Sequence, residues 1–178
     1  FEHKRQQSEA INNAMPIVEA VSAEYAALSG RPQPILDMYG MDDAEYAIIV
    51  LSSTAGTSRA VAREWRAKGH KVGILKPRVY RPFPAKRIVE AIKGCKAVAV
   101  LDRAISFGAP EGQGPLFTDT VAALYNEGVV GLKIVDYIFG LGGRDTVPAM
   151  IGSVFRDLQA IEASGDRGPM VRYLGLRE

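Results

Sequence analysis

Four short apolar runs alternate with helical segments through the middle of the chain, and this alternation leaves little choice of fold. The runs are AIIVL at 47–51, VGIL at 72–75, AVAVL at 97–101 and LKIVDYIF at 132–139. Short strands that are apolar on both faces are typical of a parallel sheet covered by helices on both sides. The first three runs begin 25 residues apart (47, 72 and 97), which is enough for a right-handed helical crossover between them. The pattern predicts an α/β protein.

Helical periodicity and glycine stops predict the remaining elements. We expect helices over residues 57–68, 84–93, 115–126 and 146–163. Before them, residues 4–28 predict one long helix that ends at Gly30, with Pro16 marking a kink or a restart. Residues 35–39 follow two prolines and precede a short link to the first apolar run, so they predict an edge strand antiparallel to the others.

Composition narrows the class of protein. Hydrophobic residues make up 47% of the 178 residues and charged residues 24%, as in a globular domain with a substantial core. The formal charge of +2 comes from 22 basic and 20 acidic residues, which are scattered. This distribution argues against a dedicated nucleic-acid binder. No apolar run approaches the ~20 residues of a membrane span, so we expect no membrane partner.

The single cysteine and the two histidines speak against a metal or iron–sulfur site in this chain. Cys95 has no second cysteine for a disulfide, and an iron–sulfur cluster usually needs four thiolates. His3 and His70 without a CxxC pair leave no zinc spacing. We expect Cys95 to be a small buried apolar group, and Trp65 to pack in the core. The chain has no signal-peptide pattern and no initiator Met, so we expect a piece of a longer or processed polypeptide in a reducing, cytoplasmic compartment.

The loop after the first apolar run, SSTAGTSR at 52–59, allows two interpretations. Its hydroxyls and its glycine precede a helix, so Ser53, Thr54, Gly56 and Thr57 form a candidate anion-binding loop. Capping of that helix by a Ser or Thr side chain is the competing interpretation. The segment matches neither the dinucleotide fingerprint nor the P-loop.

Three later loops carry arginine, aromatic and glycine residues at the carboxyl ends of predicted strands, where α/β sheets bind ligands. The stretches are RVYRPFP at 78–84, DRAISFG at 102–108 and GLGGRDT at 140–146. They contain no His or Cys to complete a nucleophile–base pair, so we assign no catalytic residue. Arginine and aromatic residues are enriched at protein interfaces. The candidate interface or supporting residues are Arg81, Phe83, Asp102, Arg103, Ser106 and Arg144.

YRPFP (80–84), LDRAISFG (101–108) and GLGGRD (140–145), in this order, resemble the 2-oxoacid:ferredoxin oxidoreductases, pyruvate:ferredoxin oxidoreductase among them. The resemblance is to the C-terminal domain of their alpha subunit and covers about residues 11–165. It includes Ala14-Met15, Gly30-Arg31 and the stretch DMYGMDDAEYAIIVLSS. The chain departs from the family pattern at Pro32-Gln33-Pro34 and at Leu51-Ser52-Ser53.

This resemblance implies a transketolase C-terminal-like domain, a three-layer α/β/α fold. Its five strands run in the order 1-3-2-4-5 with the first antiparallel. The whole enzyme joins a 2-oxoacid, here expected to be pyruvate, to CoA, releases CO2 and reduces ferredoxin, as in anaerobic metabolism. It uses thiamine diphosphate, Mg2+ and [4Fe-4S] clusters held by other domains, so we expect this chain to bind none of them. Its expected partners are other domains or subunits of the same oxidoreductase.

The resemblance divides the chain into a helical linker at 1–30, the α/β domain at 31–165 and a C-terminal tail at 166–178. We expect an assembly domain that is not catalytic by itself. Two alternatives remain open at this point. One is the C-terminal domain of another thiamine-dependent 2-oxoacid dehydrogenase, and the other is a free-standing α/β module that binds an anion or nucleotide.

Overall fold

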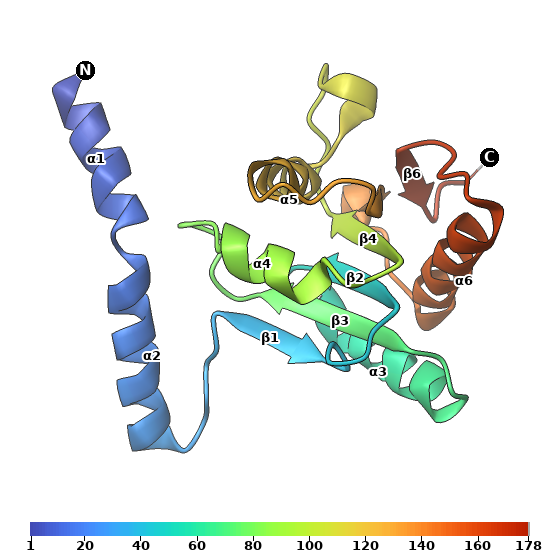
Figure 1. The fold of residues 1–178 in the computed structure, drawn as a ribbon, viewed down its shortest axis with the longest axis horizontal. Coiled ribbons are helices and arrows are strands. Elements are labelled where there is room, and N and C mark those ends of the chain that lie inside the picture. Colours follow the sequence, from blue (N-terminus) through green and yellow to red (C-terminus); the bar gives the residue numbers. More distant parts are fainter. Residues whose placement is uncertain (178) are drawn as a thin grey trace.

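The computed structural model describes residues 1–177, and a six-stranded sheet lies at its centre (Figure 1). The strands are β1 (Leu36–Tyr39), β2 (Tyr46–Val50), β3 (Val72–Pro77), β4 (Ala97–Asp102), β5 (Lys133–Phe139) and β6 (Val171–Leu174). Their order is β1-β3-β2-β4-β5-β6. β1 pairs antiparallel with β3 at the edge, and every other pair is parallel. The expected order of the first five strands and the antiparallel edge strand are confirmed.

The sixth strand corrects the expectation of five. Residues 166–178 were expected to form a tail, but β6 pairs in parallel with β5, from Val171 opposite Asp136 to Leu174 opposite Phe139. The sequence VRYL has only four residues and is interrupted by Arg172, so it lacks the continuous apolar run that marks the central strands. Pairing with β5 therefore determines this strand, and the local sequence does not.

Two helices cover each face of the sheet. α3 (Thr54–Ala67) and α6 (Pro148–Ser164) pack on one face, and α4 (Ala85–Ile92) and α5 (Pro115–Asn126) pack on the other. Along β2 the side chains alternate, with Ile48 in the α3–α6 core and Ile49 in the α4–α5 core. Cys95 is buried in the α4–α5 core, and the indole of Trp65 packs against the α3–α6 core. Both core placements match the sequence-based expectation.

The N-terminal segment forms a helical arm that projects from the domain (Figure 1). It consists of α1 (Glu2–Asn12) and α2 (Met15–Ser29), with Pro16 in the first turn of α2, where a proline costs no backbone hydrogen bond. Gly30 ends the arm in the left-handed conformation, at φ +68°. The expected long helix is thus two helices with a restart at Pro16. No residue of either helix is buried.

Two short 3-10 helices lie in the loops that follow β4 and β5. They are η1 (Pro110–Gly112) and η2 (Leu141–Gly143). Across residues 1–177, no helix is both long enough and apolar enough to cross a membrane.

Candidate functional site

The loops after β2, β4 and β5 meet at one edge of the sheet and enclose two adjoining cavities. The outer cavity, of about 210 Å³, is lined by Ser53, Thr54, Thr57, Arg103, Phe139, Gly143, Arg144, Asp145 and Thr146. The inner cavity, of about 270 Å³, is lined by Leu51, Ser52, Ser53, Thr54, Tyr80, Leu101, Asp102, Arg103, Ala104, Pro115 and Phe139. Both lie at the carboxyl ends of parallel strands, where helix–sheet–helix folds leave a crevice. The structure therefore gathers loops that are up to about 90 residues apart in the sequence.

Arg103 connects the loop after β4 to the loop after β5. Its Nε donates a hydrogen bond to the carbonyl oxygen of Gly140 at 3.1 Å. A Cβ on Gly140, which has a φ of +65°, would lie 3.1 Å from that same nitrogen, so glycine lets the guanidinium approach the backbone. The two Nη groups of Arg103 make no hydrogen bond or ion pair within residues 1–177.

Arg144 connects the loop after β5 to the end of β6. Its Nη1 donates to the carbonyl oxygen of Gly175 at 2.5 Å, and the side chain is half-buried. Arg144 has no carboxylate partner within 4.0 Å in the described chain, although Asp145 lines the same cavity. Arg103 and Arg144 are therefore fixed by backbone carbonyls and keep donors that can face a ligand.

The hydroxyl groups of the first loop do not cap α3. The N-terminus of α3 has no side-chain cap, and Ser53 precedes it in a helical conformation. Ser53, Thr54 and Thr57 instead line the outer cavity. Gly56 lies outside both linings, and its N–H is taken by the carbonyl oxygen of Ser53 at 2.9 Å. The capping interpretation is therefore wrong, and Gly56 is not positioned to donate to a ligand.

Asp102 has a structural role. It is 4% exposed, and its two carboxylate oxygens accept the N–H groups of Leu116 and Phe117 at 3.1 and 2.9 Å, at the start of α5. Burial raises the pKa of Asp102, and these two hydrogen bonds oppose the rise. A Cβ on Gly114 would lie 2.2 Å from the Asp102 carboxyl carbon, so this turn accepts only glycine without a rearrangement. Asp102 therefore fixes the start of α5 through backbone amides, and little of its surface is left for contact with a partner subunit.

Asp136 is a second buried carboxylate beside Asp102, and it was not among the sequence-based candidates. It is fully buried, its Oδ2 accepts the N–H of Gly114 at 2.7 Å, and its Oδ1 has no partner in the described chain. Burial raises its pKa to about 7, and the nearby Asp102 charge adds to the rise. The available signal was the single acidic residue inside the apolar run at 132–139.

Arg81 and Phe83 belong to a cluster on the α5 side of this edge. Arg81 bridges to Asp119 at 2.7 Å and lies over the Tyr80 ring at 4.1 Å. The Tyr80 hydroxyl donates to the same carboxylate at 2.8 Å, and burial together with this carboxylate raises the pKa of Tyr80 to about 12. Phe83 meets Tyr80 edge to face and is half-buried. Neither residue lines the two cavities.

Ser106 lies in the loop that projects beyond the sheet between β4 and α5. Next to it, Phe107 is 90% exposed, far more than an aromatic ring in a protein core. The N–H of Ser106 is bonded to the carbonyl oxygen of Gln113 at 3.2 Å, which closes the loop at its base. The loop therefore exposes an apolar ring, while a backbone hydrogen bond at its base holds its two ends together.

The chemistry of the two cavities is that of binding. Their lining contains no His, Cys or Lys, and residues 1–177 hold no group of three acidic, His or Cys side chains placed for a metal ion. Cys95 is buried away from this edge, and burial raises the pKa of its thiol to about 11. In the outer cavity an arginine pair and four hydroxyls supply donors for negative charge, and the described residues offer no activated nucleophile beside them.

Comparison with known proteins identifies the family. Residues 44–151 match the family model described as pyruvate:ferredoxin oxidoreductase core domain II. The chain is 41% identical over 178 residues to pyruvate synthase subunit PorA of Thermotoga maritima, and 32% identical to ketoisovalerate oxidoreductase subunit VorA of Pyrococcus horikoshii. These matches cover 100% and 99% of this chain, but 44% of each relative, so the chain spans less than half the length of these relatives.

A solved structure agrees at the level of the fold. The 2-oxoglutarate:ferredoxin oxidoreductase from Magnetococcus marinus, solved with 2-oxoglutarate, coenzyme A and succinyl-CoA bound, aligns with a TM-score of 0.51 at 22% identity. The alignment covers 74% of this chain and 20% of that chain. The family model covers more than half of the 178 residues. The chain belongs to the pyruvate:ferredoxin oxidoreductase core domain II family.

Proposed function

We propose that this chain is an assembly domain of the alpha subunit of a 2-oxoacid:ferredoxin oxidoreductase. The complete enzyme converts a 2-oxoacid, CoA and oxidised ferredoxin to an acyl-CoA, CO2 and reduced ferredoxin. The domain's task is to position other domains and subunits, and ferredoxin and CoA interact with the complex as a whole. A cytoplasmic location belongs to the same proposal, since a buried free thiol suits a reducing compartment.

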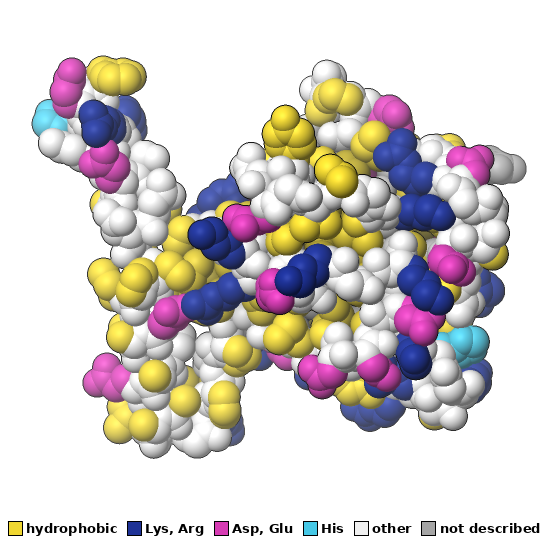
Figure 2. Space-filling view, viewed as in Figure 1, with side chains coloured by type: hydrophobic (Ala, Val, Ile, Leu, Met, Phe, Trp, Pro, Cys, Tyr) yellow, Lys and Arg dark blue, Asp and Glu magenta, His cyan; other side chains and the backbone are white. Residues whose placement is uncertain are grey.

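The observation that carries the proposal is the unburied apolar stripe on α2. Ile17, Val21 and Leu28 are 66%, 56% and 84% exposed. At about 100° per residue they fall on one side of the helix. In the space-filling view hydrophobic side chains gather over α2, whereas charged side chains dominate α1 (Figure 2).

The stripe points away from the domain. Met15 and Val18 hold the other side of α2 against the α4–α5 core, and Glu19 pairs with Arg87 on α4. A short helix with so few contacts is marginal in water without tertiary packing. A partner surface that covers Ile17, Val21 and Leu28 would supply the missing tertiary packing. Since family members extend well beyond the length of this chain, that surface belongs to the rest of the same oxidoreductase.

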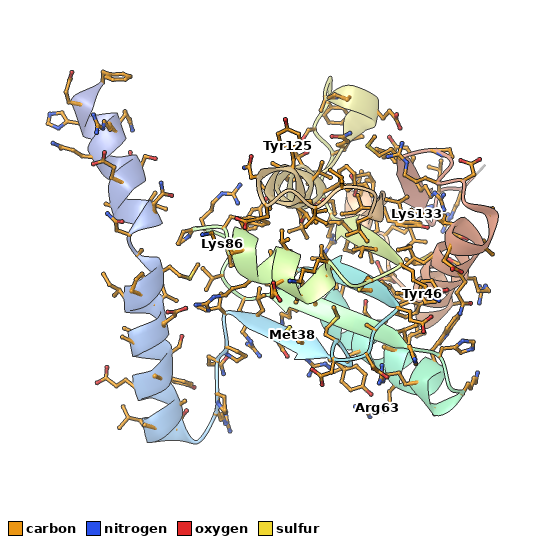
Figure 3. The ribbon with its side chains drawn as sticks, viewed as in Figure 1. Met38, Tyr46, Arg63, Lys86, Tyr125 and Lys133 are labelled. Carbon is orange, nitrogen blue, oxygen red and sulfur yellow. The ribbon has the colours of Figure 1, made fainter. Side chains whose placement is uncertain are left out.

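An apolar groove beside the arm extends this surface. It has a volume of about 670 Å³ and lies between β1 and α4, with Ile35, Leu36, Met38 and Met41 among its lining residues. Met38, on the edge strand, is 52% exposed, and Lys86 from α4 lies at the other side (Figure 3). Groove and stripe together present apolar area of the kind that marks interaction sites.

The cofactors of the whole enzyme do not fit this chain. One buried cysteine cannot hold a [4Fe-4S] cluster, and the described residues offer no carboxylate set for the Mg2+ of thiamine diphosphate. In our proposal thiamine diphosphate, Mg2+ and the clusters are therefore held by other parts of the complex. Pyruvate is the proposed substrate, because the pyruvate synthase relative is more similar than the ketoisovalerate oxidoreductase relative.

Co-purification tests the assembly role. The full-length subunit that contains this chain is co-expressed with the other subunits of its complex, with an affinity tag on one partner. Val21→Asp places a charge in the apolar stripe, and we expect loss of about 90% of the co-purified subunit, since a central interface residue commonly contributes about 2 kcal/mol. Ala23→Asp is the matched control, because Ala23 is also exposed at mid-helix but lies about 160° around the helix from Val21.

Equal co-purification of both variants would remove the stripe from the interface. The intact complex is then assayed for reduction of ferredoxin that depends on CoA, with pyruvate and with 2-oxoisovalerate as alternative substrates. Pyruvate should be the better substrate. Electron transfer to a lipoyl domain instead of ferredoxin would favour the 2-oxoacid dehydrogenase alternative.

A further inference from the structure

We propose that the outer cavity at the carboxyl edge of the sheet binds the phosphate group of a small phosphate monoester whose apolar body occupies the inner cavity. The proposal rests on two fixed guanidinium groups, four free hydroxyls and an apolar continuation of the same pocket. It goes beyond the assembly role, because it assigns a ligand to residues that need not touch another subunit.

The arginines are the first argument. Arg103 and Arg144 come from different loops and line one cavity, yet neither forms an ion pair with a carboxylate in residues 1–177. Each is fixed through a single hydrogen bond to a backbone carbonyl oxygen, of Gly140 and Gly175 respectively. Two guanidinium groups in one pocket repel each other, so the arrangement is favourable when an anion lies between them.

The hydroxyls indicate phosphate in preference to carboxylate. The same cavity is lined by four hydroxyl side chains, none of which hydrogen-bonds within the described chain: Ser53, Thr54, Thr57 and Thr146. With the two arginines they offer donors from three separate segments. A phosphate dianion has three acceptor oxygens in a tetrahedral arrangement and uses such a set fully, whereas a planar carboxylate has two.

Asp145 is the one carboxylate in the lining, and it opposes an anion. Since it carries a charge on the rim of the cavity, it lowers the affinity for phosphate without blocking the site. Asp145 therefore supplies a substitution whose effect should have the opposite sign to that of the arginine substitutions.

The inner cavity defines the rest of the ligand. It shares Ser53, Thr54, Arg103 and Phe139 with the outer cavity, so a bound molecule can pass from one to the other. Beyond the shared residues its lining is mainly apolar, with Leu51, Leu101, Ala104, Pro115 and the ring of Tyr80. Asp102 also borders it, but both of its carboxylate oxygens are occupied by backbone amides. A phosphate with an uncharged, partly apolar substituent fits this pair of cavities better than free phosphate does.

Titration with inorganic phosphate and with phenyl phosphate tests the proposal on the full-length protein. Binding is followed by calorimetry at constant ionic strength, with chloride as the balancing anion. We expect saturable binding of phosphate with a Kd of about 1 mM or below, and about tenfold tighter binding of phenyl phosphate. Benzoate at the same concentrations should bind at least tenfold more weakly than phenyl phosphate.

Variants link the binding to the cavity. Arg103→Gln should weaken the binding of phenyl phosphate at least tenfold, and Thr57→Val should weaken it about threefold. Asp145→Asn should strengthen the binding about threefold. Arg63→Gln is the matched control, since Arg63 is an exposed arginine on α3 outside both cavities and should leave the Kd unchanged (Figure 3). Circular dichroism checks that each variant is folded.

Three results would overturn the proposal. The first is binding of phosphate no tighter than that of chloride, and the second is an equal loss of affinity in Arg63→Gln and Arg103→Gln. The third is loss of subunit co-purification in Arg103→Gln without any phosphate binding by the parent, which would assign the arginines to a protein contact. The assembly role is measured separately, by co-purification of the Val21→Asp variant, so the two proposals fail independently.

Discussion

At the scale of single residues, two buried carboxylates organise the site's edge of the sheet from below. Asp102 binds the first amides of α5, and Asp136 binds the amide of Gly114 just before that helix. The first amides of a helix have no partner within the helix, so these two side chains stabilise the start of α5 by accepting hydrogen bonds there. Both are buried, however, and burial raises the pKa of each. The hydrogen bonds of both carboxyl groups therefore have to offset the free energy lost when these groups are removed from water.

Asp136 should make the stability of the domain depend on pH. Its pKa rises from an unfolded value of about 3.9 to about 7 in the folded protein. Between these values the folded chain holds a proton that the unfolded chain releases, so the contribution of Asp136 is present below about pH 4 and is lost by about pH 7. Asp136→Asn keeps an acceptor for Gly114 without ionising. We expect its melting temperature to exceed that of the parent by about 5 °C at pH 8 and to match it near pH 4.5.

Thermal unfolding across that pH range checks this prediction. Asp42→Asn is the control, because Asp42 is exposed and should change neither the melting temperature nor its slope with pH. If the melting temperature of the Asp136→Asn variant changes with pH as that of the parent does, then ionisation of Asp136 does not destabilise the folded protein.

At the scale of elements, β6 shows what local sequence cannot specify. β5 is predictable because LKIVDYIF is a nearly continuous apolar run. β6 has four residues, of which only Val171 is buried, and it forms because β5 offers a free edge. Arg172 helps to hold it, with hydrogen bonds to the Tyr137 hydroxyl at 3.1 Å and to the carbonyl oxygen of Arg167 at 2.6 Å.

A leucine substitution in this segment tests whether β6 is integral to the sheet. Leu174 packs against the α3–α6 core, opposite Phe139 in the strand register, whereas Leu176 is 72% exposed. Leu174→Asp places a charge at a half-buried apolar position, and we expect a loss of about 1–3 kcal/mol in the free energy of unfolding. Leu176→Asp should stay within about 0.5 kcal/mol of the parent. Urea unfolding measures both, and equal effects would mean that 171–174 is a tail after all.

The site itself could be predicted only in part. The sequence indicates where the loops lie, but not which side chains from distant segments meet. The chain's alternation of strands and helices places every loop end, so the meeting of the loops at 52–59, 102–108 and 140–146 follows from topology alone. The partners of individual side chains do not follow. Sequence cannot show that Arg81 would pair with Asp119, or that Ser53 would line a cavity and leave α3 without a side-chain cap. Those outcomes depend on side-chain packing between segments that are distant in sequence.

At the scale of the whole molecule, two separate projections carry exposed apolar side chains, such as Leu28 and Phe107. One is the α1–α2 arm, and the other is the loop between β4 and α5, which extends away from the sheet (Figure 1). Two projections from a three-layer domain are what we expect of an assembly domain that holds neighbouring subunits in fixed positions. The arm's role is tested by the Val21→Asp variant, which leaves the loop to be tested by itself.

Phe107 should contribute to assembly without contributing to the stability of the domain. Its ring is 90% exposed, so Phe107→Ser should change the melting temperature by no more than about 2 °C. If the loop docks against another subunit, burial of this ring stabilises the complex, and its loss should raise the dissociation constant at least about tenfold. Tyr125→Ser is the control, because Tyr125 is 79% exposed on α5 and lies outside the loop (Figure 3). Sedimentation of the full complex over a range of concentrations separates the two variants. A lower melting temperature with unchanged sedimentation would instead mean that Phe107 stabilises the domain itself. The arm would then remain as the docking surface.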